Sequence, residues 1–201
     1  MSDRLRDIKL RDILLGIIAP LIVCLIIVWF PLNEQNMMNL NPALQGIFVF
    51  GVQEVIMIVA VPMIIGLVWN KWAGGATGFL LGSIYALWYG LYGIASPSWI
   101  HNMGLLGYLL SAMLIGYIAG ALNKKSTQLS RLIFSGFMAA LVGGLFLFLV
   151  DQFASPLYVY GFYGLFITMT PRLIFGIIMP LIVWVFVRHG AKSSLKEAHN
   201  L

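Results

Sequence analysis

The sequence predicts an all-α integral membrane protein whose six transmembrane helices form one bundle, with the N- and C-termini in the cytoplasm. Three observations lead to this fold class: the composition, the length of the apolar runs and the distribution of the basic residues. Of the 201 residues, 61% are hydrophobic and 9% are charged, against roughly 45–50% and about 25% in ordinary soluble domains. Several apolar runs also reach the roughly 20 residues that a helix needs to cross a hydrocarbon core about 30 Å thick.

The apolar runs give the order of the elements. We expect six spans at about 11–30, 43–69, 74–95, 103–122, 131–151 and 165–187. The loops are short and no linker or low-complexity tract interrupts the chain, so residues 1–201 are expected to form a single domain. The stretch MSDRLRDIKLRD resembles the charged start of a signal peptide. The run after it is long enough to span and lacks a small-residue cleavage site, so it is interpreted as the first helix.

Basic residues gather at one side of the predicted bundle. Eleven of the twelve lysines and arginines precede the first span, follow the last one, or lie in the loops after the second and fourth spans. The opposite loops, PLNEQNMMNLNP, ASPSWIHNM and DQFASPLYVYGFYG, contain none. By the positive-inside rule both termini are cytoplasmic, and the chain is a multi-pass protein of the cell membrane. The net charge of +5 is then a signal of topology and not of a nucleic-acid partner, and the basic residues are expected to contact anionic membrane lipid.

Small residues recur at four-residue spacing in three of the spans. Such spacing lets helix backbones approach closely where lipid provides no hydrophobic drive for association. We therefore expect the helices over 74–95, 103–122 and 131–151 to pack tightly together through these positions, which are Gly78 and Gly82, Gly116 and Gly120, and Gly136, Ala140 and Gly144.

Two ionisable residues lie inside the predicted hydrocarbon region, away from the span ends. Glu54 is seventeen residues from Lys71, and Arg172 is sixteen from Arg188. At about 1.5 Å per residue, both lie about 25 Å from the cytoplasmic boundary, so they share one level. Because charges are costly inside a membrane, such residues are functional candidates.

Aromatic and polar residues are predicted near the same level. Trp88, Tyr108 and Phe148 lie sixteen or seventeen residues from the basic residue that bounds their own span, and His101 and Asp151 lie just beyond them toward the outside. Aromatic walls with a few convergent polar groups are typical of a small-molecule site. We therefore expect an outward-facing substrate pocket lined by Glu54, Trp88, Tyr108, Phe148, Arg172, His101 and Asp151.

Simpler interpretations of these residues remain open. Glu54 and Arg172 are also compatible with a purely structural interhelical ion pair. Tryptophan and tyrosine near an outer boundary often form only the interfacial belt, and His101 is compatible with an ordinary surface residue. Pro171 would make Arg172 an early residue of its helix, from which its side chain can snorkel toward the outer surface.

Catalytic motifs are missing from the sequence. It contains no H-E-x-x-H, no G-x-S-x-G, no phosphate-binding loop and no cluster of metal-ligating residues, so we expect no enzyme activity, no metal and no cofactor. The single cysteine, Cys24, excludes an intrachain disulfide. Besides binding of a small molecule in the outward-facing pocket, two functions of other classes remain open for the chain. One is a lipid-modifying membrane enzyme, and the other is a non-catalytic subunit or scaffold of a larger complex.

One family shares this pattern. The stretches GGATGFLLGSIYALWYG and GLLGYLLSAMLIGYIAGALNKKS are followed by a basic turn and a glycine-rich fifth span. Over about residues 45–188 the chain resembles the substrate-binding S components of energy-coupling-factor (ECF) transporters. The resemblance implies capture of a vitamin or similar micronutrient from outside, with a separate transmembrane coupling subunit and two cytosolic ATPases driving its release inward. Many members carry Ala-x-x-x-Ala in the first helix; here GIIAPLIV places Gly16 and Ala19 three apart, so the resemblance does not include this signature.

Overall fold

The computed structural model describes residues 54–92, 100–154 and 161–199. The predicted span at 11–30 and the beginning of the span at 43–69 lie outside these residues. The described part is helical and contains no strand. Its elements are the π-helical turn η5 (Ile56–Ala60) and the α-helices α4 (Val61–Val68), α5 (Lys71–Tyr92), α6 (Ile100–Asn123), α7 (Leu129–Ala154) and α8 (Gly161–His199).

Three of these helices are long and apolar enough to cross a membrane by length and composition. The apolar segments are Leu106–Asn123 in α6, Leu129–Phe153 in α7 and Gly164–Arg188 in α8. Helix α5 has 22 residues but is not among them, since its glycines and tyrosines make it less apolar. The second predicted span is represented by the shorter apolar stretch Ile56–Val68. The all-helical fold is thus confirmed for the described residues, and three of their helices are compatible with membrane spans. The number of six spans and the orientation of the termini stay predictions.

Large apolar side chains cover much of the outer surface of the bundle. Five phenylalanines are more than half exposed, one on α5, two on α7 and two on α8: Phe79, Phe134, Phe153, Phe166 and Phe186. Soluble proteins bury most of their large apolar side chains. A surrounding of lipid explains this surface, because hydrocarbon carries no penalty for contact with aromatic or aliphatic side chains.

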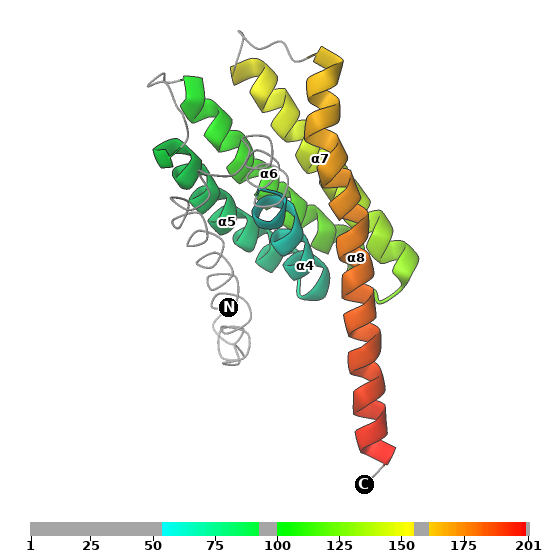
Figure 1. Ribbon diagram of the computed structural model, residues 1–201. Helices are drawn as coiled ribbons and strands as arrows, with labels where there is room; N and C mark the ends of the chain where they lie inside the picture. Colours follow the sequence, from blue (N-terminus) through cyan, green and yellow to red (C-terminus); the bar gives the residue numbers. More distant parts are fainter. Residues whose placement is uncertain (1–53, 93–99, 155–160, 200–201) are drawn as a thin grey trace, which may run out of the picture.

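Helix α6 lies at the centre of the described bundle. It packs against α5 on one side and α7 on the other, and the short α4 also contacts it; α8 packs mainly on α7 (Figure 1). Successive helices run in opposite directions, so the α4–α5 and α6–α7 turns come to the same end. There Asn123 donates a hydrogen bond from Nδ2 to the Leu67 carbonyl (3.0 Å), and both groups are buried in the bundle.

Glycines bring α4, α5 and α6 into backbone contact. A Cβ placed on Gly116 would overlap the backbone of Gly74, and one on Gly120 would lie 2.6 Å from the Lys71 Cα and 2.8 Å from the Gly66 carbonyl oxygen. The tight packing expected between the first two of the three glycine-bearing spans, which are α5 and α6, is therefore confirmed.

The small-residue stripe of α7 faces a different neighbour from the one we expected. A Cβ on Gly136 would meet Pro180 and Gly176 of α8, and Ala140 also packs on Gly176. The expectation that this stripe packs α7 against the two preceding helices is wrong, because a spacing of four residues identifies a close-packing face without naming its partner. Helix α7 meets α6 through another glycine, Gly143, whose carbonyl accepts a hydrogen bond from Ser111 Oγ (2.8 Å).

Helix α8 is longer than predicted and starts earlier. Its 39 residues include Pro171 and Pro180 inside the helix, and at about 1.5 Å per residue it extends roughly 58 Å. A membrane core about 30 Å thick cannot contain this length. The C-terminal part projects beyond the other helices (Figure 1), and it carries the polar sequence that follows Arg188. Because α8 begins at Gly161, Arg172 lies well inside the helix and not near its start, contrary to the interpretation based on Pro171.

Candidate functional site

A buried ion pair joins the two charged residues that the sequence singled out. Arg172 and Glu54 are 3% and 6% exposed, and the Arg172 Nη2 donates to Glu54 Oε1. The Arg172 Nη1 donates to the Thr168 carbonyl one turn earlier on α8 (2.5 Å). Among the described residues, the Arg172 Nε has no hydrogen-bond partner. The arginine therefore faces the interior and does not snorkel to the outer surface.

The π-helical turn η5 contributes to the direction in which Glu54 points. The Val61 amide donates to the Ile56 carbonyl, five residues earlier, and Pro62 follows directly. Proline lacks an amide hydrogen and so cannot continue the α-helical ladder at that point. A turn with one extra residue rotates the preceding face by about 100° relative to an uninterrupted helix, and Glu54 lies on that preceding side.

A glycine provides the space for the arginine on the other side. A Cβ placed on Gly144 of α7 would lie 3.3 Å from the Arg172 Cδ and 2.7 Å from the Met169 Sδ. The stem of Arg172 thus runs over bare backbone, at the position where the stripe of α7 faces α8. A Cβ at position 144 would force the Met169 sulfur to move and would press on the stem of Arg172.

Polar and aromatic groups from three more helices surround the pair. Tyr108 of α6 lies close enough to interact electrostatically with Glu54 and Arg172, and Asp151 of α7 lies within range of the same two charges. The ring of Tyr108 packs against Tyr85 of α5 with 5.2 Å between centroids and 58° between planes. Tyr85 is 1% exposed. We call these five residues, Glu54, Tyr85, Tyr108, Asp151 and Arg172, the polar layer.

Four of the seven predicted site residues belong to this layer, and Tyr85 is one that the sequence reasoning missed. It lies one turn before Trp88 on α5, whose side chain lies outside the described part, as does that of His101. Phe148 is half-buried on α7, four residues after Gly144 and three before Asp151, so it shares their helix face. A signal for Tyr85 exists in the sequence: it is the tyrosine three residues after Gly82, on the glycine-bearing face of α5.

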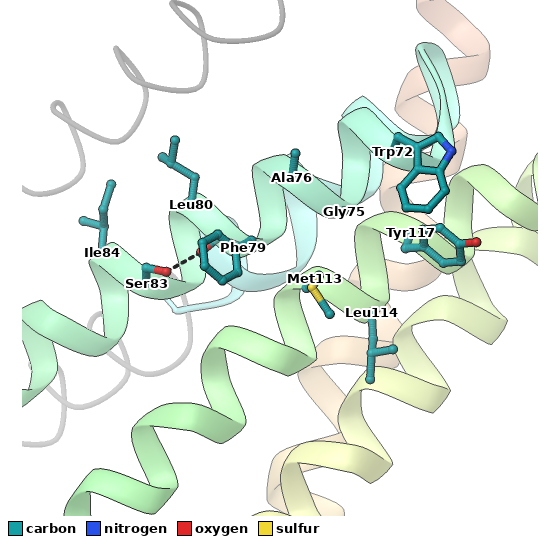
Figure 2. A pocket seen from close by; sticks show the side chains of 10 residues that line it. All are labelled: Trp72, Gly75, Ala76, Phe79, Leu80, Ser83, Ile84, Met113, Leu114 and Tyr117. Carbon is teal, nitrogen blue, oxygen red and sulfur yellow. Dashed lines mark hydrogen bonds between the residues drawn. The ribbon is translucent and has the colours of Figure 1, made fainter. Parts of the chain in front are cut away.

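A groove of about 710 Å³ lies away from the polar layer, on the surface formed by α5 and α6. It extends from Trp72 to Ile84 along α5 and is bounded by Met113, Leu114 and Tyr117 on α6 (Figure 2). No residue of the polar layer lines it. The structure thus has two separate features, a buried polar layer and an apolar surface groove.

The described residues do not bring three histidine, cysteine or carboxylate side chains together as a metal site would require. Comparisons of the chain with protein-family models, curated proteins and solved structures found no match. The chemistry of the polar layer and of the groove is therefore the basis for any functional statement.

Proposed function

We propose that the chain is the substrate-capture subunit of a membrane importer and that the polar layer binds its ligand, a small water-soluble micronutrient. The observation that carries this proposal is Arg172: a fully buried guanidinium group that retains an unpaired Nε donor among the described residues. A buried donor without a partner costs about 1–3 kcal/mol. A carboxylate or carbonyl group of a ligand would remove that cost.

The neighbours of Arg172 suit such a ligand. Tyr85 and Tyr108 supply aromatic surface against which a flat ring can pack. Glu54 and Asp151 supply acceptors for ligand N–H or O–H groups, and Asp151 lies nearer the end of α7 that is remote from the basic turns. A ligand entering from that end would meet Asp151 before Arg172.

In this proposal the protein is an S component of the ECF type, as the sequence pattern over 45–188 suggests. Import then depends on a transmembrane coupling subunit and cytosolic ATPases, because the chain itself has no ATP-binding motif. The positively charged turns would face the cytoplasm, where those partners act.

A second candidate is a non-catalytic subunit of a larger membrane complex. It is favoured by the direct contact between Glu54 and Arg172, since two charges that neutralise each other need no ligand. In that case the exposed aromatic faces of α7 and α8 would contact other subunits. The third class, a lipid-modifying enzyme, would require turnover of a lipid headgroup.

Native mass spectrometry of the protein, extracted from its own membranes in mild detergent, separates these functions. We expect the parent to carry a small-molecule mass addition that the double variant Arg172→Met with Glu54→Gln lacks. Phe166→Ala, at an exposed position on α8, serves as the control and should keep the addition. Co-purified subunits without any small molecule would favour the scaffold. If the folded double variant retained the same mass addition as the parent, the proposed binding role of the polar layer would be wrong.

A further inference from the structure

The groove between α5 and α6 has walls that suit hydrocarbon. Apart from Ser83, its lining consists of apolar or aromatic residues and Gly75. The Ser83 hydroxyl donates to the Phe79 carbonyl of its own helix (2.7 Å), as the dashed line in Figure 2 shows. The groove therefore offers a water-soluble molecule almost no hydrogen-bonding group. A saturated or unsaturated acyl chain needs none.

The hollow arises from small residues flanked by large ones. Gly75 and Ala76 have little or no side chain and form the floor of the groove. The large side chains of Trp72 and Phe79, which are 70% and 53% exposed, project before and after them along α5. From Trp72 to Ile84 the helix rises about 18 Å. One leaflet of a hydrocarbon core about 30 Å thick is about 15 Å deep, so the groove has the length of a single acyl chain in one leaflet.

A positive charge lies at one end of the groove. The Lys71 Nζ is 5.6 Å from the ring centroid of Trp72 and 5.6 Å from that of Tyr117, within cation–π range of both. The two rings meet edge to face at 5.4 Å. In Figure 2 the indole nitrogen of Trp72 and the hydroxyl of Tyr117 both lie at the end of the groove remote from Ile84. Three polar tips thus gather where the apolar walls stop.

The end of the bundle where the groove stops is positively charged. It carries Lys71, Lys124, Lys125 and Arg131, whereas the only acidic residues among those described are Glu54, Asp151 and Glu197. The single ion pair of the described part is the one between Arg172 and Glu54. Neither Glu54 nor Asp151, the two acidic residues whose side chains the structure describes, forms an ion pair with Lys71. An anionic group would complement this lysine.

We propose that the groove binds one anionic phospholipid, with an acyl chain between α5 and α6 and the phosphate at Lys71. Trp72 and Tyr117 occupy the level of the headgroup, where amphipathic aromatic rings are favoured. The site differs from general attraction of basic turns to lipid because it fixes one lipid at one lysine. It is independent of the ligand proposed for the polar layer.

Binding of phosphatidylglycerol and of phosphatidylcholine with the same acyl chains tests this site. The readout is the occupancy of the first bound lipid in a native mass spectrometry titration in mild detergent. We expect Lys71→Gln to weaken phosphatidylglycerol about fivefold, and to weaken phosphatidylcholine less, because the choline group of that lipid already partly neutralises its phosphate. Lys124→Gln, which removes a charge from the same end but away from the groove, is the matched control and should leave both affinities within a factor of two.

Filling the groove tests the acyl-chain half of the proposal. Ala76 is exposed, so Ala76→Phe adds a ring to the floor without displacing a core residue. It should weaken both lipids at least tenfold, whereas Thr170→Phe, at an exposed position on α8, should have no effect. Phe79→Ala removes one wall and should weaken both lipids severalfold. Equal losses in Lys71→Gln and Lys124→Gln, or unchanged binding in both Ala76→Phe and Phe79→Ala, would overturn the proposal.

Discussion

Arg172 of α8 and Glu54, which precedes η5, form an ion pair inside the bundle although they are 118 residues apart in the sequence. Two charges withdrawn from water lose several kcal/mol of hydration each, and their attraction recovers this loss only when both are present. The pair therefore constrains how the second and the last predicted spans meet. It also gives a way to separate a structural role from a binding role.

Removal of the positive charge alone should destabilise the fold. We expect Arg172→Met to lower the free energy of unfolding by about 3–5 kcal/mol, because it leaves the Glu54 carboxylate buried without its partner. Arg172→Met combined with Glu54→Gln should restore most of this loss, since no unpaired charge remains. Thermal unfolding in detergent, followed by circular dichroism, measures both.

Arg131→Met is the control for this pair, because Arg131 is exposed on α7 and its Nε donates only to the Leu122 carbonyl (3.2 Å). It should change stability by less than about 1 kcal/mol. If the Arg172 variant unfolds at the same temperature as the Arg131 variant, the ion pair does not hold the helices together. A double variant that is stable yet keeps full ligand affinity would leave the pair with a structural role alone.

The glycine contact between α4, α5 and α6 should not tolerate even one methyl group. Gly116→Ala and Gly120→Ala place a Cβ onto the backbones of Gly74 and Lys71, so each should cost about 1–3 kcal/mol as in other overpacked interiors. Gly75→Ala is the matched control: its Cβ would lie 3.4 Å from Tyr117 Cβ, an ordinary contact. Melting temperatures of the three variants decide the matter, and equal values would show that α5 and α6 are free to separate.

The order of the described helices could be predicted from the sequence because it follows from the length of the apolar runs. The residues at which the helices begin and end were harder to predict. Helix α5 begins at Lys71 and not at residue 74, since the side chain of Asn70 accepts a hydrogen bond from the Ala73 amide (2.9 Å) and caps the first turn. Glycine is a poor helix former, yet close packing on α6 keeps Gly74 and Gly75 helical.

The common level of Glu54, Arg172 and Tyr108 could also be predicted, because the rise per residue is fixed. The rotation of each helix about its own axis could not be predicted. The π-helical turn before Pro62 alters the direction of Glu54 by about a quarter turn, and no periodicity in the sequence announces it. For the same reason Tyr85 could not be predicted as the neighbour of Tyr108: depth alone does not decide which of two aromatic residues one turn apart meets a given neighbour.

The turn between α6 and α7 contains backbone strain that a glycine should relieve. Lys124 and Lys125 have φ angles of 49° and 61°, in the left-handed region that costs an L-residue about 1–2 kcal/mol. Lys125→Gly should therefore raise the melting temperature or leave it unchanged. Thr127→Gly, at a neighbouring exposed position without positive φ, should lower it slightly because glycine adds disorder to the unfolded chain. A lower melting temperature for Lys125→Gly than for Thr127→Gly would contradict the assigned strain.

The orientation in the membrane is a prediction that cysteine labelling tests directly. In a Cys24→Ser background, Asn36→Cys, Ser98→Cys and Ser155→Cys occupy the predicted outer loops, and Ser126→Cys lies in the turn between α6 and α7. A membrane-impermeant thiol reagent added to intact cells should modify the first three variants and not the fourth, because the basic turns are expected in the cytoplasm. After permeabilisation Ser126→Cys should react as well, which controls for accessibility of the turn. Labelling of Ser126→Cys in intact cells would reverse the orientation, and it would place Lys71 and its groove in the outer leaflet, since the α4–α5 and α6–α7 turns lie at the same end of the bundle.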